Sequence, residues 1–209
     1  MLSVPLDAET LETCIAAAMA APSFFNTQPW RFRLDAKNVA FQVRAAPERS
    51  LRHADPAGRA LHLSVGASVF NLRVAVSHFG WSPVLRLLPR PENPRLLAAA
   101  RRTGALRRPT TKHRADLYSA IWRRHSSRFP FTGQPLPPQA RAELAEAAQA
   151  EGASPAFPEA ADTARLLRVT AEAEQRNRLD ADRGTESRGR VHRDPDDVTD
   201  AGLPRWASA

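Results

Sequence analysis

The segment from Arg59 to Phe79 constrains the fold of this chain more than any other. Read as a helix, it is apolar on almost every face, and such a helix must lie inside a domain core or at a subunit interface. Gly80 follows it as a typical helix stop. Gly66, Ala67 and Ser68 make one side thin, which would let another backbone or a flat ligand come close. The apolar positions are Leu61, Leu63, Val65, Val69, Phe70, Leu72, Val74, Ala75, Val76 and Phe79.

The same segment carries His62, Asn71, Arg73 and His78, so we expect no transmembrane span. The first residues of the chain have no basic region leading into an apolar run, so we expect no signal peptide. A single cysteine, Cys14, lies in an apolar helical pattern, which excludes an internal disulfide framework and fits a reducing compartment. These features predict a soluble, cytoplasmic protein.

Shorter elements precede the long helix. Residues 7–20 predict a helix with Asp7 as its N-cap, and Pro22 follows as a stop. Residues 30–34 and 39–43 alternate aromatic or aliphatic with polar side chains, which predicts two strands joined by a tight turn.

The sequence after the long helix predicts one strand and several helices. We expect a strand at 84–88, a short helix at 93–102, a basic linker at 103–112, and helices at 116–124 and 139–151. From residue 172 the chain is charged and poor in aliphatic residues, so we expect a helix to about Asp182 and then a frayed tail.

A formal net charge of +8 raises the question of nucleic acid. The arginines are scattered from Arg31 to Arg205 and mixed with acids, which indicates compositional bias rather than a designed patch. The densest cluster lies between Arg101 and Arg128 and could attract a polyanion. Because no zinc-finger spacing or RNA-binding aromatic signature accompanies it, nucleic acid is not the partner that the sequence favours.

The stretch APSFFNTQPW, residues 21–30, places aromatic bulk beside amide side chains directly after a helix end. One interpretation is a strand-entry turn whose Phe24, Phe25 and Trp30 fill the core. The other is one wall of a pocket for a flat ring with polar edges.

A second stretch, IWRRHSSRFPF at residues 121–131, sets Arg124, His125, Ser126 and Arg128 at a helix end. Arginine forks bind phosphate oxygens bidentately, and a hydroxyl adds a neutral donor. The alternative is an exposed basic helix end that offsets the helix dipole. The sequence shows no catalytic triad and no metal-ligand spacing.

Together the two stretches resemble motifs of the nitroreductase-fold flavoproteins. RRHSSRF is similar to that family's Arg-x-Ser-x-Arg motif, and APSFFNTQPWRF to its Pro-Ser-x-x-Asn-x-Gln-Pro-Trp motif. In ordinary members the Arg/Ser motif comes first, whereas here it lies about a hundred residues downstream. That order resembles the two-repeat, Acg-like branch, in which two halves are fused into a single-chain pseudo-dimer.

The resemblance implies an α+β, nitroreductase-type fold: a sheet flanked by helices, a long buried central helix and an incomplete second repeat. Residues 1–112 would form the first half, and residues 113–209 a partial second half with a charged tail. Because members of that branch continue further, we expect a truncated or degenerate relative. Homodimerisation through residues 59–80 could then complete the site.

By the same resemblance, the cofactor is FMN, held between the two motifs, with NAD(P)H as co-substrate. Arg124, Ser126 and Arg128 would hold the flavin's phosphate, ribityl chain or pyrimidine edge, with His125 beside them. From the other half, the ring would be lined by Pro22, Ser23, Phe24 and Asn26. Arg59 is an additional candidate ligand, and His62 and His78 are expected to be core or helix-face residues.

The function implied is an FMN-dependent oxidoreductase that passes hydride from NAD(P)H through the flavin to a nitro-aromatic or quinone-like acceptor. No side chain need act as nucleophile or metal ligand, because the flavin carries the chemistry. The partners are a small-molecule electron acceptor and a second copy of the chain, without a membrane. Two alternatives stay open: a flavin-binding or flavin-sequestering protein without turnover, and an inactive truncated relative.

Overall fold

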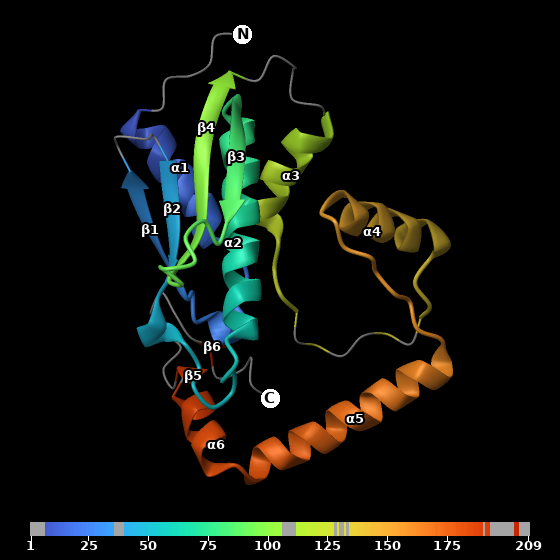
Figure 1. Ribbon diagram of the computed structural model, residues 1–209. Coiled ribbons are helices and arrows are strands. Elements are labelled where there is room, and N and C mark those ends of the chain that lie inside the picture. Colours follow the sequence, from blue (N-terminus) through green and yellow to red (C-terminus); the bar gives the residue numbers. More distant parts are fainter. Residues whose placement is uncertain are drawn as a thin grey trace. The chain divides into compact units, whose positions relative to one another are not determined.

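In the computed structural model, helix α2 (Arg59–His78) packs against a four-stranded sheet (Figure 1). Helix α1 (Ala8–Met19) lies beside α2, and both are behind the sheet in the view of Figure 1. The strand order is β1-β2-β4-β3 and all neighbouring strands are antiparallel. The strands are β1 (Trp30–Asp35), β2 (Ala40–Ala45), β3 (Trp81–Leu87) and β4 (Leu96–Ala105).

The chain divides into two compact units. One consists of residues 1–126 with 185–209, and the other of residues 127–184. The first unit also contains α3 (Lys112–Arg123), and the second contains α4 (Pro138–Ala150) and α5 (Ala160–Leu179). The sequence predicts that two repeated halves meet at residue 112. The two compact units do not test this division, so it stays a prediction. The structure describes residues 7–35, 40–105, 112–127, 129, 132, 134–189, 191–192 and 203–204.

Helix α1 forms where the sequence predicts it. The Asp7 carboxylate accepts a hydrogen bond from the backbone N–H of Thr10 at 2.8 Å, which caps the helix and lowers the pKa of Asp7. Cys14, Ala17 and Ala18 are fully buried in the core. Burial raises the pKa of the Cys14 thiol to about 12, so this thiol stays neutral.

Helix α2 has the predicted bounds within one residue, and Gly80 after it has the predicted left-handed conformation, with φ 85°. Leu63, on the opposite side, is 77% exposed. The helix is therefore buried along one side rather than all round. By length and composition α2 could also cross a membrane, but 56% of its most apolar window is buried within the protein. That burial is typical of a core helix.

A polar seam on the buried side of α2 joins it to the end of α1. The Ser68 hydroxyl donates to the carbonyl of Ala18 at 2.9 Å, and the Asn71 amide donates to the carbonyl of Ala17 at 3.0 Å. These carbonyls belong to the last turn of α1, where a helix leaves carbonyl groups short of partners. The Ala18 carbonyl also accepts the backbone N–H of Ala21 at 3.3 Å. The two side chains therefore satisfy the end of α1 inside the core.

The antiparallel pair β1 and β2, with Trp30 opposite Ala45, confirms the two predicted strands. The turn predicted between them lies outside the described residues. The strand predicted at 84–88 is confirmed as β3. The helix predicted at 93–102 is wrong, because these residues form most of β4 in the interior of the sheet. Pairing with β2 on one side and β3 on the other overrides the helix propensity of its leucine, alanine and arginine residues.

The C-terminal part is more helical than predicted. The helix expected to end near Asp182 is α5, which ends at Leu179, and α6 (Ala181–Arg188) follows it. The Glu186 carboxylate accepts hydrogen bonds from the backbone N–H groups of Arg52, His53 and Ala54 at 2.6, 3.1 and 2.8 Å. Two-residue strands β5 (Val191–His192) and β6 (Leu203–Pro204) pair in parallel. The other tail residues lie outside the described part.

We predict that Asn71→Ala destabilises the protein by about 1–3 kcal/mol, because it leaves the buried Ala17 carbonyl without its donor. The matched control is Thr13→Ala on the exposed side of α1, where the hydroxyl bonds only to its own helix, at the Glu9 carbonyl. That variant should stay within about 0.5 kcal/mol of wild type. Urea unfolding of both variants measures the difference, and equal stabilities would contradict the role of the seam.

Candidate functional site

The loop between α1 and β1 has an unusual backbone. A short helical turn, η1 (Phe24–Asn26), is followed by an extended entry into the sheet. Phe25, Asn26 and Gln28 have φ angles of 51°, 50° and 46°. The left-handed region is disfavoured for residues with a Cβ, and a bulky residue such as phenylalanine is rarely found there. Such strain persists only where the surrounding structure enforces it, and it concentrates at functional sites.

Hydrogen bonds from three segments hold this loop. Within it, the Ser23 hydroxyl accepts from the backbone N–H of Gln28 at 2.9 Å. From α2, the Ser64 hydroxyl accepts from the backbone N–H of Phe24 at 3.2 Å. From the segment after β2, the Arg49 guanidinium donates to the carbonyl of Gln28 at 3.1 Å. The strained backbone is therefore fixed at its start and at its end.

The aromatic residues of the loop divide between the two interpretations offered by the sequence. Trp30 is buried in the core, as a strand-entry turn requires. Phe24 is 47% exposed, and its ring meets that of Phe25 edge to face at 4.8 Å between centroids. The loop therefore serves the core at its β1 end and presents an aromatic surface at its α1 end.

Helix α3 brings the second motif to this loop. It packs on α2, with Ile121 buried in the core and the Tyr118 ring stacked on the His78 ring at 3.9 Å between centroids. Just after α3, the Arg124 guanidinium donates to the carbonyl of Ala20 at 3.4 Å and to the Ser126 hydroxyl at 3.0 Å. Two segments about a hundred residues apart therefore meet at the end of α1.

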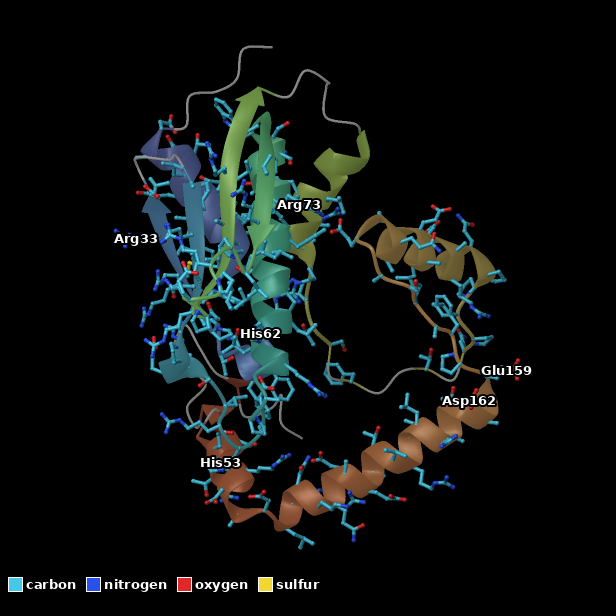
Figure 2. All side chains as sticks on the ribbon, in the orientation of Figure 1. Arg33, His53, His62, Arg73, Glu159 and Asp162 are labelled. Carbon is cyan, nitrogen blue, oxygen red and sulfur yellow. The ribbon has the colours of Figure 1, made fainter. Side chains whose placement is uncertain are left out.

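The structure places most of the predicted site residues. Arg124, His125 and Ser126 are exposed, Pro22 and Phe24 are exposed, and Ser23 and Asn26 are half-buried. Arg128 lies outside the described residues. Arg59 is exposed at the first turn of α2, and the exposed His62 ring contacts the carbonyl of Gly58 at 2.7 Å, as expected of a helix-face residue. Figure 2 shows His62 near one end of α2.

The arrangement offers an anion-binding end and an aromatic end. The Arg124 fork and the adjacent Ser126 hydroxyl are exposed and suit a phosphate, while Phe24 offers a ring to a flat ligand. Among the described residues, no group of three or more His, Cys, Asp or Glu side chains could hold a metal ion.

Four residues that shape the site were not found from the sequence: Arg49, Ser64, Ser68 and Asn71. The last three lie on one side of α2, because they are spaced four and three residues apart. A polar row at helical spacing within an otherwise apolar helix was a readable signal. Arg49 had no such signal, because its contact with Gln28 depends on the tertiary fold.

The contact between His78 and Tyr118 predicts a pH dependence of stability. Partial burial lowers the pKa of His78 below the usual value of about 6.5, so the folded state favours the neutral ring. The stabilisation is complete above the unfolded-state pKa and is lost as the pH falls through the lower folded-state pKa. Thermal unfolding of wild type should therefore lose stability on acidification below about pH 6.5 more steeply than that of His78→Phe. Identical pH profiles would contradict this role.

Comparison with known proteins relates part of this chain to a family. Residues 3–88 match the model of the Nitroreductase family. Two Mycobacterium tuberculosis proteins are similar to this chain: "Putative NAD(P)H nitroreductase Rv3131", 35% identical over 63% of this chain, and "Putative NAD(P)H nitroreductase acg", 31% identical over 61%. This chain spans 37% of the length of each of these relatives.

Solved structures show weaker likeness. A nitroreductase family protein from Streptococcus pneumoniae has a TM-score of 0.39 at 18% identity, over 53% of this chain and 88% of its own. A "putative nitroreductase in complex with FMN" from Desulfovibrio desulfuricans has a TM-score of 0.37 at 21% identity, over 62% of this chain and 90% of its own.

The matched segment contains α1, the strained loop, the β1–β2 hairpin, α2 and β3. The fold class predicted from the sequence, α+β with helices flanking a sheet and a long central helix, is confirmed for the first unit. Residues 3–88 of this chain are therefore similar to the Nitroreductase family, whose model they match.

Proposed function

We propose that this chain is the flavin-binding part of an FMN-dependent oxidoreductase of the nitroreductase type. The single observation that carries the proposal is the meeting of the Arg124–Ser126 segment with the end of α1, directly before the strained loop. The family match covers the loop, and similar proteins carry the name NAD(P)H nitroreductase. The chain spans just over a third of those relatives, so the activity of the whole protein is part of the proposal.

The residues present fit the flavin's two ends. Arg124 and Ser126 would bind the phosphate, because a guanidinium fork and a hydroxyl 3.0 Å apart offer several donors to one oxyanion. Phe24 would contact a face of the ring, and Ser23, Asn26 and Pro22 would line its edge. His125 would add a donor beside Arg124; Arg128, which the motif also includes, lies outside the described residues. When bound, FMN would supply hydride chemistry that these side chains lack.

The remaining partners follow from the same proposal. The co-substrate would be NAD(P)H, and the acceptor a nitro-aromatic or quinone-like molecule small enough to reach the ring. The exposed side of α2 around Leu63 would be covered by a second copy of the chain, and the setting would be the cytoplasm. A flavin-binding protein without turnover would use the same residues, so kinetics must separate the two.

We predict that Arg124→Gln weakens FMN binding at least about tenfold, because it removes charge-assisted hydrogen bonds to the phosphate. Arg123→Gln is the matched control. It removes the same charge one residue away, from a side chain that bonds to Ser119 within its own helix, and should change the affinity less than about twofold.

Flavin fluorescence quenching measures both dissociation constants, and circular dichroism checks the fold. Equal effects of the two substitutions would overturn the phosphate site. A wild-type protein that stays colourless with excess FMN would overturn the flavin proposal itself.

We predict that NADPH or NADH bleaches the flavin absorbance of the FMN-loaded protein within seconds under anaerobic conditions. Adding a nitro-aromatic or quinone should then restore the colour at a rate that does not depend on the nicotinamide, as a ping-pong cycle requires. Stopped-flow absorbance measures both phases. Bound flavin that neither nicotinamide bleaches would favour the non-catalytic flavin-binding alternative.

A further inference from the structure

The outward face of the sheet gathers arginines that are far apart in the sequence. Along β1, Trp30 and Phe32 point to the helices, so Arg31 and Arg33 point the other way. Figure 2 shows Arg33 projecting away from the helices. The strand register extends this outward set to Arg44 on β2, Arg86 on β3 and Arg101 on β4.

The register arranges these side chains in rows. Arg33 pairs with Gln42, Gln42 with Ala99, and Ala99 with Arg86, so one row carries an arginine on each edge strand of the sheet. Three strand spacings separate the two arginines, which is about 14 Å. In a neighbouring row Arg31 stands directly opposite Arg44. The face therefore presents positive charge across its full width.

Among the described residues, acidic side chains offset only part of this charge. Arg31 forms an ion pair with Glu48, and Asp35 lies on the same face as the arginines. Like charges directly opposite each other across two strands are destabilising. Arg31 opposite Arg44 is such a pair. The ion pair of Arg31 with Glu48 already offsets part of the repulsion, and a bound anion would offset more. In the first unit, the helices α1 and α2 cover the other face of the sheet.

The chemistry of the face selects among anionic partners. The other outward residues in the paired rows are Asp35, Ala40, Gln42, Ser82, Val84, Leu96 and Ala99. None has an aromatic ring on which an unpaired base could stack. A membrane-binding surface also needs bulky apolar side chains that are free to insert. In these rows Leu96 is buried, and Val84 is the largest exposed apolar side chain. Guanidinium forks match phosphate oxygens, and the regularly spaced phosphates of a nucleic acid duplex suit charge that is spread across the full width of the sheet.

We propose that this arginine face (Arg31, Arg33, Arg44, Arg86 and Arg101) binds the phosphate backbone of duplex nucleic acid without reading its sequence. The sequence disfavours such a partner because its arginines are scattered, but strand alternation and register bring five of them to one surface. The inference is independent of the flavin site, which is built from α1, α2 and the segment after α3.

The test is fluorescence anisotropy of a labelled 20-base-pair DNA duplex, titrated with the full chain at several salt concentrations. The wild-type affinity should fall steeply with salt. Arg33→Gln with Arg86→Gln should weaken binding at least about tenfold and reduce the slope of log K against log salt by about 2. Arg165→Gln with Arg168→Gln on α5 removes the same charge and should leave the slope unchanged.

Equal losses in the two double variants would show that net charge alone drives binding, which overturns the proposal. A wild-type protein that binds vesicles of phosphatidylserine but no duplex would assign the face to a membrane and overturn it as well. Preference for a single strand over the duplex would also contradict it. The single variant Arg101→Gln should reduce the slope by about 1, and it serves if the double variant folds poorly.

Discussion

The end of α1 is the point on which the candidate site depends. A helix leaves its last carbonyl groups without partners, and burying them unpaired costs about 1–3 kcal/mol for each group. Here Ser68 donates to the buried carbonyl of Ala18 and Asn71 to that of Ala17, while Arg124 donates to the carbonyl of Ala20 at the exposed end. Two donors come from α2 and one from the segment after α3. Satisfying one helix end therefore fixes where three segments of the chain meet.

This junction explains why a strained loop can exist beside it. Left-handed φ angles at Phe25, Asn26 and Gln28 are costly. They persist because Ser64 holds the loop backbone at Phe24 and Arg49 holds it at Gln28. The same row of polar residues on α2, running from Ser64 to Asn71, thus secures both the helix end and the loop. A flat ligand would meet a surface that is already ordered, and binding would spend less free energy on ordering the loop.

Much of this could be predicted from the sequence. The long helix, the hairpin and the loop were readable because apolar periodicity and turn residues are local signals. The strand β4 was not, because the run Leu96–Arg102 favours a helix and becomes a strand only through pairing on both sides. The motifs identified Arg124, Ser126 and the loop, but the contact with Ala20 and the gathering of arginines on the sheet required the tertiary fold.

The central claim is that the Arg124–Ser126 segment lies against the start of the loop in the folded protein. A spin label on Ser126→Cys tests it directly, in a Cys14→Ser background that leaves a single thiol to label. The account predicts that paramagnetic broadening in the NMR spectrum is strong for the amides of residues 23–26 and weak for those of residues 33–35, at the far end of β1. Sharp amide signals throughout residues 23–26 would contradict it.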